Sequence, residues 1–242
     1  MGRLILHMFM TLDGVMQAPG EPDEDLEGGF KHGGWQAPYL DEESGRVMFE
    51  DMATLDALLL GRKTYDIFAA YWPVAPNEVP FTALLNDAPK FVASQTLESP
   101  RWDPTTIIRN VAEDVPRLKG EFKEIHVSGS ADLVQSLLRH DLVDRMNLWI
   151  YPVLLGTGKR VFAEGTIPKA LRLIEARTFT TGTVAVRYER AGEPVYGDTG
   201  LDAAGAHWPI EPSPLVLNGS SQGTLSDGAE TDGGRAVGSQ VA

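Results

Sequence analysis

The hydrophobic residues of this chain fall into short runs that alternate with helical patterns. Residues 3–12 are rich in Leu, Ile, Met and Phe and alternate loosely, which is typical of a strand inside a sheet. Shorter apolar runs follow, each ending at Gly or at a polar residue, and they cover 57–60, 90–93, 105–108 and 124–127. The pattern therefore predicts a series of buried strands along the first part of the chain.

Helical patterns lie between these strands. The segment 41–55 begins with acidic residues and places Val47, Met48, Met52 and Leu55 on one face. Further helical patterns cover 64–71, 111–118 and 131–140. Strands that alternate with helices predict an α/β fold, with a mostly parallel sheet and helices on both of its faces.

The last third of the domain departs from this alternation. Segments 145–155, 171–180 and 184–189 have strand patterns with little helix between them. Strands without crossover helices pair in antiparallel fashion, so we expect antiparallel strands at the C-terminal end of the sheet. Residues 1–190 are therefore predicted to form one domain.

The chain changes character after Arg190. Residues 191–242 consist largely of Gly, Ala, Ser, Asp and Pro, and they hold seven acidic residues against one basic residue. Such a segment cannot bury enough apolar surface to fold alone, so we expect an acidic tail that is mostly disordered. One short apolar part, 207–210 with 215–217, could dock on the domain or on a second subunit.

A long segment without periodicity follows the first strand. Residues 13–38 are rich in Gly, Pro and acidic residues, and they also contain Phe30 and Trp35. Loops of this length inside a compact domain are usually functional or disordered, and the two aromatic residues favour a function.

Composition excludes several classes of protein. The chain has 34 acidic and 21 basic residues and a net charge of -13, which opposes binding to nucleic acid and to anionic membranes. It has no cysteine, so disulfides, thiolate zinc sites and cysteine nucleophiles are excluded. The five histidines lack metal-ligand spacing, and no apolar run reaches membrane-spanning length. We expect a cytoplasmic protein that binds a small molecule and no metal.

The strongest local motif is the run from Gly61 to Tyr65, which follows a buried strand and opens a helix. Unpaired N–H groups at a helix N-terminus attract anions, Thr64 can cap the helix, and Arg62 and Lys63 add positive charge. The run predicts a phosphate-binding corner. The alternative is an ordinary turn between strand and helix with two exposed basic residues.

Other strands also end in polar or small residues. Ser128, Gly129 and Ser130 follow one strand, while Ser94 and Arg109 follow two others. In open α/β sheets ligands bind at the carboxyl ends of the strands, so we expect these residues at one binding edge. Neither a GxGxxG fingerprint nor a GxxxxGK[ST] loop is present.

The order of these motifs along residues 3–190 resembles the dihydrofolate-reductase-like superfamily. The resemblance is to the branch related to the C-terminal reductase domain of the bifunctional riboflavin deaminase-reductase. It is carried by Thr11-Leu12-Asp13-Gly14, Gly61-Arg62-Lys63-Thr64-Tyr65, Ser94-Gln95-Thr96-Leu97, Ser128-Gly129-Ser130, Leu142-Val143-Asp144 and the run from Pro152 to Lys159. The resemblance implies a three-layer fold with a twisted sheet, a homodimer, and NADPH as the cofactor.

The resemblance also implies which residues bind the cofactor. They are Leu12, Gly14, Gly61, Arg62, Lys63, Thr64, Ser94, Arg109, Ser128, Gly129, Ser130 and Leu133. Arg62, Lys63 and Thr64 would hold phosphates, and Ser94 with Arg109 would lie near the adenosine 2′-phosphate. Basic and hydroxyl side chains suit this additional phosphate better than the acidic residue typical of NAD sites.

A reductase of this kind also needs a proton donor, and the candidates are Asp13, Asp41 and Glu42, with Glu43 beside them. Each has a structural alternative. Asp13 and Gly14 form a typical turn pair, and acidic residues at 41–43 complement the dipole of the helix that they begin.

The sequence therefore predicts an NADPH-dependent reductase of a small heterocyclic, carbonyl or imine substrate. It resembles 5-amino-6-(5-phosphoribosylamino)uracil reductase of riboflavin biosynthesis, without the cysteine-ligated zinc site of a deaminase. The long loop 13–38 favours a reshaped pocket and a different substrate. The alternative is a non-catalytic NADP-binding or assembly protein of the same fold.

Overall fold

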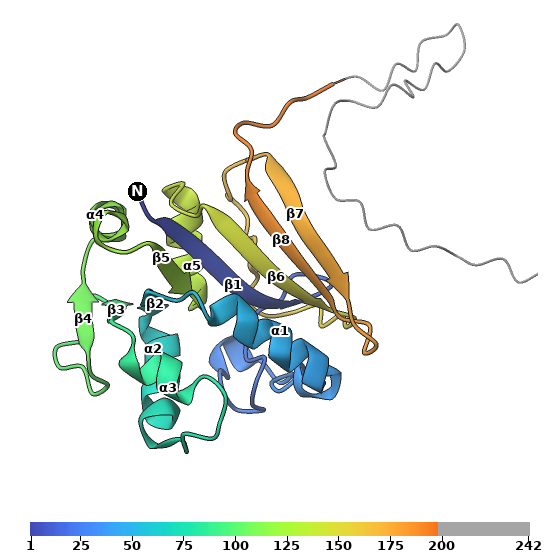
Figure 1. Cartoon of the computed structure of the whole chain (residues 1–242). Coiled ribbons are helices and arrows are strands. Elements are labelled where there is room, and N and C mark those ends of the chain that lie inside the picture. Colours follow the sequence, from blue (N-terminus) through green and yellow to red (C-terminus); the bar gives the residue numbers. More distant parts are fainter. Residues whose placement is uncertain (198–242) are drawn as a thin grey trace, which may run out of the picture. The chain divides into compact units, whose positions relative to one another are not determined.

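A mixed sheet forms the centre of the computed structural model, which describes residues 1–197 (Figure 1). Its eight strands lie in the order β4-β3-β2-β5-β1-β6-β8-β7. Their bounds are β1 (Arg3–Thr11), β2 (Ala57–Gly61), β3 (Lys90–Ala93), β4 (Thr105–Ile108), β5 (Glu124–Val127), β6 (Arg145–Tyr151), β7 (Leu171–Thr178) and β8 (Val184–Arg190). Strands β1 to β6 are mutually parallel, and β8 and β7 add antiparallel pairs. The predicted fold class is confirmed.

Helices connect the parallel strands as the alternation predicts. They are α1 (Glu42–Met52), α2 (Arg62–Tyr71), α3 (Thr82–Asp87), α4 (Val111–Glu121) and α5 (Ala131–Arg139), with short 3-10 turns at Glu27–Gly29, Ala37–Tyr39 and Trp72–Val74. The sequence pattern missed α3, which is a single short element that begins after Phe81 without a side-chain cap. The predicted strand 145–155 ends earlier, at Tyr151, because Pro152 cannot donate to a ladder.

The two faces of the sheet have separate cores, which gives the three layers. On one face Leu4, Leu6 and Met8 of β1 pack with residues of α4 and α5, including Leu118 and Leu137. On the other face a cluster around β2 packs on α2 and α3, and a third cluster joins α1 to β6 and to the long loop. Residues with opposite parity on β1 therefore contact different helices, as the alternation of a strand requires.

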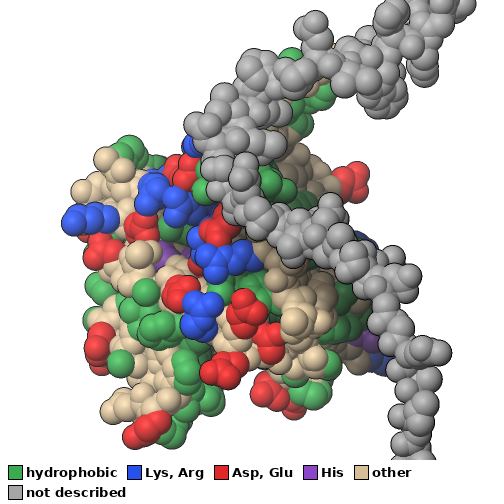
Figure 2. Space-filling view, turned by 45° about the vertical axis from the view of Figure 1, so that its right-hand side comes forward, with side chains coloured by type: hydrophobic (Ala, Val, Ile, Leu, Met, Phe, Trp, Pro, Cys, Tyr) green, Lys and Arg blue, Asp and Glu red, His purple; other side chains and the backbone are tan. Residues whose placement is uncertain are grey.

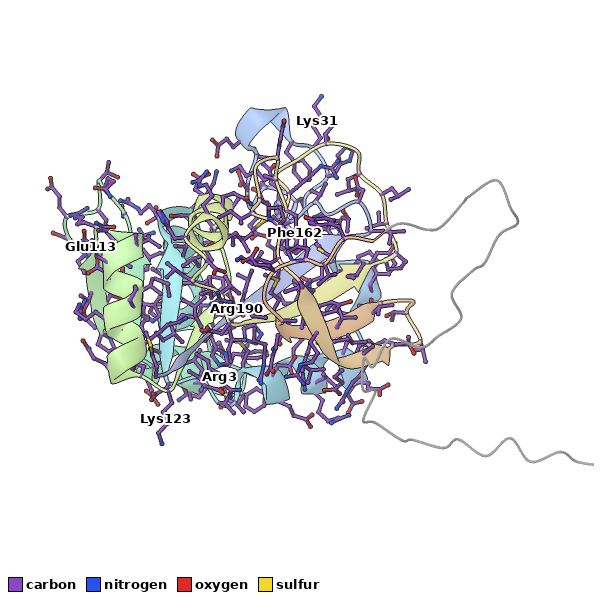
Figure 3. All side chains as sticks on the ribbon, turned by 90° about the horizontal axis from the view of Figure 1, so that it is seen from above. Arg3, Lys31, Glu113, Lys123, Phe162 and Arg190 are labelled. Atoms are coloured by element: carbon purple, nitrogen blue, oxygen red, sulfur yellow. The ribbon has the colours of Figure 1, made fainter. Side chains whose placement is uncertain are left out.

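Parallel pairing places the carboxyl ends of β1 to β6 at one edge of the sheet. In Figure 3, Arg3 and Lys123, at the amino ends of β1 and β5, lie in the lower part of the view, and Lys31 of the long loop lies at the top. Every motif that the sequence placed after a strand therefore lies at the same edge as this loop.

The long loop 13–38 is part of the packed domain. Val15, Ala18, Phe30 and Trp35 are buried in the cluster with α1 and β6. The indole N–H of Trp35 donates to the carbonyl of Gln17 at 2.8 Å. Phe30 and Trp35 therefore hold the long loop against the domain at the carboxyl edge of the sheet.

The last strand ends at Arg190, where the predicted domain ends. Residues 198–242 lie outside the described residues, and so does nearly all of the predicted acidic tail with its 207–210 and 215–217 segments. Among the described helices, none is long and apolar enough to cross a membrane.

Candidate active site

Two helix N-termini meet at the carboxyl edge of the sheet. Gly61 is the N-cap of α2 and Ser130 is the N-cap of α5, and no side chain of the described residues caps either helix. The corners are adjacent, since Gly61 N donates to the carbonyl of Gly129 at 3.0 Å. Thr64 does not act as the cap that the sequence predicts, because the helix starts before it. Free N–H groups at helix N-termini are groups that attract anions, and two helices present them side by side at this edge.

Glycine is required at these corners because the two turns pack against each other. A Cβ on Gly61 would lie 2.0 Å from Ser130 Oγ, and a Cβ on Gly129 would lie 2.8 Å from Thr64 Oγ1. Gly129 also has a φ of 106°, which favours glycine. The close approach keeps the N–H groups of both helices directed at one place.

An open groove of about 510 Å³ runs past both helix N-termini. It brings together most of the residues that the resemblance assigns to the cofactor: Gly61, Arg62, Lys63, Ser94, Arg109, Ser130 and Leu133. Its lining holds four basic side chains, three carboxylates and hydroxyl groups, and two of the carboxylates are paired with its basic side chains: Asp66 with Arg62, and Glu27 with Lys63 and Lys159. The N-termini of α2 and α5 add positive dipole ends. This combination suits a ligand with several phosphates.

Ser94 and Arg109 hold the turn after β3. Ser94 Oγ accepts from Leu97 N at 3.0 Å and from Thr96 N at 3.3 Å, so its hydroxyl proton remains for a ligand. The guanidinium of Arg109 donates to the carbonyls of Ser94 and Leu97. Arg109 therefore stiffens this wall of the groove and brings a positive charge to it.

An ion cluster joins the long loop to this groove. Asp25 accepts from Lys63 Nζ at 2.6 Å and from Lys159 Nζ at 2.8 Å, and Glu27 accepts from the same two lysines. Burial alone would raise the pKa of Asp25, but the hydrogen bonds from Lys159 and Lys63 lower it to about 2. Lys63 therefore lines the groove while its ammonium group is paired with two carboxylates of the long loop. Sequence analysis missed Asp25, Glu27 and Lys159.

A second cavity, of about 270 Å³, lies between the long loop and the start of α2. Thr64, Ser128 and Gly129 line it from the sheet edge, while Gln36 and Glu24 line it from the loop. It shares Lys63, Ser130, Ala131 and Lys159 with the groove, so the two spaces adjoin. Burial raises the pKa of the Glu24 carboxyl, and the N–H groups of Gly20 and Glu21, which donate to it at 2.7 and 3.2 Å, act in the opposite direction.

A third cavity, of about 140 Å³, lies between α1 and α2. Its walls are mainly aromatic side chains and methionines, and the lining residues are His7, Phe9, Met48, Asp51, Met52, Phe68, Trp72, Phe81, Leu85, Ser128 and Trp149. His7, Phe9, Phe68 and Ser128 also line the second cavity, so the two are neighbours. The site is therefore a polar groove followed by an apolar recess under the helices.

The structure does not support Asp13 as a proton donor. Its carboxylate accepts from Thr11 Oγ1 at 2.6 Å, Gly156 N at 2.8 Å and Leu155 N at 3.2 Å. Burial would raise its pKa, but these hydrogen bonds together outweigh burial and lower the pKa to about 2. An acid that is ionised at neutral pH cannot donate a proton. Asp13 instead ties the turn after β1 to the segment after β6.

The other two predicted proton donors, Asp41 and Glu42, lie at the start of α1 and outside the cavities. Asp41 is the N-cap of α1 and forms a capping box with Ser44, whose N–H donates to it at 2.7 Å. These hydrogen bonds lower the pKa of Asp41. Glu42 is exposed in the first turn, and neither residue lines a described cavity. The helix-capping alternative is the better interpretation of both acids.

Two of the predicted cofactor residues do not line these spaces. Leu12 is 65% exposed, and its N–H donates to the carbonyl of Val153 at 3.0 Å. Gly14 forms the turn after β1 with a φ of 84°. Both support the loop rather than forming a wall of the groove or the cavities.

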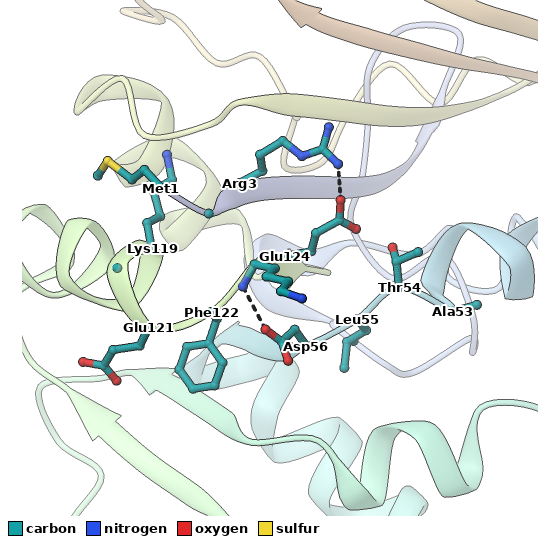
Figure 4. A pocket seen from close by; sticks show the side chains of 13 residues that line it. Met1, Arg3, Ala53, Thr54, Leu55, Asp56, Lys119, Glu121, Phe122 and Glu124 are labelled. Atoms are coloured by element: carbon teal, nitrogen blue, oxygen red, sulfur yellow. Dashed lines mark hydrogen bonds and ion pairs between the residues drawn. The ribbon is translucent and has the colours of Figure 1, made fainter.

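A further hollow lies at the opposite, amino edge of the sheet (Figure 4). Its carboxylates already have partners: Glu124 pairs with Arg3, and Asp56 accepts from the backbone N–H of Lys123 at 2.8 Å. It has neither a helix N-terminus nor an apolar recess. We therefore place the active site at the carboxyl edge.

The face shown in Figure 2 carries charged side chains of both signs, which lie intermingled. Within residues 1–197, no group of three or more His, Asp or Glu residues could hold a metal ion.

The fold and the site together define a class. A mostly parallel sheet with an antiparallel C-terminal pair, and paired helix N-termini at its carboxyl edge, are those of a dihydrofolate-reductase-like α/β protein. The model of the RibD C-terminal domain matches residues 3–185. The chain belongs to the RibD C-terminal domain family.

Two curated relatives come from Bacillus subtilis (strain 168). The uncharacterized protein YyaP is 31% identical over 197 residues, which covers 78% of this chain and 96% of YyaP. The uncharacterized protein YwjB is also 31% identical, over 194 residues, and the match covers 98% of it.

Solved structures show the same fold at low sequence identity. A protein from Shewanella sp. PV-4, named as a riboflavin biosynthesis protein, matches with a TM-score of 0.56 and 22% identity over 78% of this chain and 98% of its own. A pyrimidine reductase-like protein from Corynebacterium diphtheriae has a TM-score of 0.52 and 15% identity, covering 78% of this chain and 92% of its own. The deaminase/reductase of Thermotoga maritima has the same two values, and the match covers 78% of this chain and 56% of that longer protein.

Proposed function

We propose that this protein is an NADPH-dependent reductase of a small heterocyclic, carbonyl or imine substrate. The observation that carries the proposal is the pair of uncapped helix N-termini beside a groove that also holds Arg62, Arg109 and Ser94. Phosphates suit such a site, and a reduced nicotinamide would supply a hydride there. The membership in a family of reductase domains supports the same function.

The residues of this chain would bind and orient the reactants. Arg62 and the N–H groups of α2 and α5 would hold the phosphates of the dinucleotide, while Arg109 and Ser94 would hold the additional phosphate of NADPH. The adjoining cavities would take the reacting rings and exclude water from them. Glu24, which lines the second cavity and has a raised pKa, would hold the proton that reduction consumes.

The substrate would differ from the phosphorylated uracil of riboflavin biosynthesis. Lys63 and Lys159, the lysines next to the second cavity, are paired with Asp25 and Glu27 of the long loop. A phosphate on the substrate would have to compete with these carboxylates. The pairing therefore favours a substrate without a phosphate group.

Titration of the purified protein with NADPH and NADH, followed by nucleotide fluorescence, tests the cofactor. We expect selective binding of NADPH, weakened about tenfold in Arg62→Ala because one charge-assisted hydrogen bond is lost. Arg46→Ala is the matched control, since Arg46 forms a similar exposed pair with Glu50 one turn along its helix, as Arg62 does with Asp66. Equal affinities in all three proteins, or no binding to either nucleotide, would refute the cofactor assignment.

Turnover separates a reductase from a non-catalytic NADP-binding protein. We expect NADPH oxidation with at least one compound in a panel of unphosphorylated heterocycles, ketones and imines. Stoichiometric NADPH binding without oxidation of any panel compound would favour the non-catalytic alternative.

We also propose that the protein is a homodimer that pairs through the outer strand β7. Leu173 and Ile174 of β7 are 43% and 42% exposed on an edge strand, where apolar side chains favour association. Light scattering coupled to size-exclusion chromatography tests this, and Leu173→Lys should convert a dimer into a monomer. A wild-type monomer would refute the proposal.

A further inference from the structure

A row of polar side chains crosses the face of the sheet beneath α1. It includes His126 of β5, His7 of β1 and Asn147 of β6, with His7 opposite Asn147 in the ladder. The two imidazole rings are stacked with centroids 4.6 Å apart. All three side chains are buried, and the charged side chains of Arg187, Arg145 and Asp51 lie close to this row.

His7 stands out in this row because it faces both inner cavities of the site. It is only 6% exposed, and its Nε2 atom has no hydrogen-bond partner among the described residues. A buried polar atom without a partner costs free energy, and a ligand that supplies the partner removes that cost. The sheet therefore holds a ring nitrogen without a partner on a residue that lines the recess.

The neighbours of His7 determine which role Nε2 has. Burial holds the pKa of His7 well below its usual value, and His126, Arg187 and Arg145 lower it further, so the ring is neutral at pH 7. The amide nitrogen of Asn147 lies 3.5 Å from Nδ1 and can only donate. With the amide in this orientation, Nδ1 is the acceptor and Nε2 carries the proton, which makes Nε2 the donor offered to a ligand.

The size and lining of the recess limit the ligand. Its volume of about 140 Å³ is close to that of cavities that hold a single benzene-sized ring. Phe9, Phe68 and Trp149 provide flat apolar walls. The acidic Asp51 of the lining is buried and paired with Arg187, so an anionic ligand would meet a carboxylate whose countercharge is already used.

We propose that His7 is a specificity-determining residue, which donates one hydrogen bond from Nε2 to an acceptor on the edge of an uncharged six-membered ring held between α1 and α2. Binding of such a ring does not depend on the proposed function. Only the identification of this ring as part of the substrate rests on it. It identifies the substrate class as compact, uncharged rings with an acceptor such as a ring nitrogen or a carbonyl.

Two probes of nearly equal shape test the hydrogen bond. 4-Methylpyridine has a ring nitrogen that accepts, and toluene has none; in mildly alkaline buffer the pyridine is uncharged. Their dissociation constants are measured by ligand-observed NMR, without nucleotide, on wild type and on His7→Phe. Comparing the ratio of the two constants between proteins cancels the different hydration of the probes.

We expect the preference for 4-methylpyridine over toluene to fall about tenfold in His7→Phe, because phenylalanine keeps the ring and loses the donor. His140→Phe is the matched control: His140 is exposed at the end of α5, and the ratio should stay at its wild-type value. An unchanged ratio in His7→Phe, or failure of both probes to bind wild type, would overturn the proposal.

A second measurement on the wild-type protein does not depend on whether the variant folds. Heteronuclear NMR spectra of the imidazole nitrogens should show the His7 Nε2–H signal moving when 4-methylpyridine is added and not when toluene is added. A signal that stays in place would also overturn the proposal. Because no nucleotide is present, this failure is separate from a failure of NADPH to bind, which would leave the ring site intact and remove the reductase function.

Discussion

Asp25 connects three distant parts of the chain through two ion pairs. It lies in the long loop, Lys63 is in the first turn of α2, and Lys159 follows β6. Its side chain is only 10% exposed, so solvent screens these pairs weakly. Replacing it by Asn keeps the size of the side chain and removes the charge.

The pKa of Asp25 sets the size of the expected effect. Lowering it from 3.8 to about 2 corresponds to roughly 2 kcal/mol of additional stability for the ionised carboxyl in the folded protein. We therefore expect Asp25→Asn to lower the free energy of unfolding by about 2 kcal/mol at neutral pH. The loop should also become less protected against hydrogen exchange, because the lysines no longer hold it.

The sign of the pH dependence follows from the depressed pKa. The contribution of Asp25 is fully present above the unfolded pKa of about 4 and is lost as the pH falls through the folded value of about 2. Urea unfolding of wild type and Asp25→Asn across this range checks it. The two proteins should differ by a constant amount down to about pH 4, and the difference should then shrink and vanish below about pH 2.

Glu50→Gln is the control for this experiment. Glu50 pairs with Arg46 at 2.5 Å, but both side chains are more than half exposed, so its loss should change the free energy of unfolding by less than about 0.5 kcal/mol. Equal losses for Glu50→Gln and Asp25→Asn, or a difference from wild type that persists at low pH, would refute the assignment of the stability to the buried ion cluster.

Three other substitutions test separate parts of the structure. Tyr65→Phe leaves two backbone N–H groups, of Arg101 and Trp102, without the hydroxyl that accepts from them at 2.8 and 3.1 Å, and should cost about 1–3 kcal/mol in urea unfolding. Leu118→Ala opens a cavity in the core beside α4 and should cost about 2–5 kcal/mol in the same assay. Asp13→Asn should lower the melting temperature and leave the pH dependence of NADPH oxidation unchanged; a lost acidic limb in that profile would show that Asp13 titrates in catalysis after all.

Local patterns carried most of the fold. The apolar runs at 57–60, 90–93 and 124–127 correspond to β2, β3 and β5. A buried parallel strand is mostly apolar, and each of these segments ends where the chain turns, so neighbouring residues are enough to locate the strand. Helix α3 was missed for the opposite reason. It has only six residues, which is too short for a helical pattern of apolar residues to be recognised in the sequence.

The roles of the acids were decided by the tertiary structure. The sequence by itself placed Asp13, Asp41 and Glu42 near a binding edge, but their hydrogen-bond partners determine whether an acid caps a helix, ties a turn or keeps a proton. Asp13 meets Gly156 from across the domain, and Asp25 meets Lys159. Residues so far apart in the sequence leave no pattern from which their pairing could be predicted.

The sequence by itself determined the corner between β2 and α2, because a strand, Gly61 and a helix start are consecutive along the chain. Only the tertiary structure placed this corner against Gly129 and built the recess that His7 faces. A helix N-terminus owes its charge to its own backbone, whereas a cavity is formed by side chains from several strands and helices. The helix N-terminus and the cavity lie side by side only because the strands of the whole sheet pair in this order.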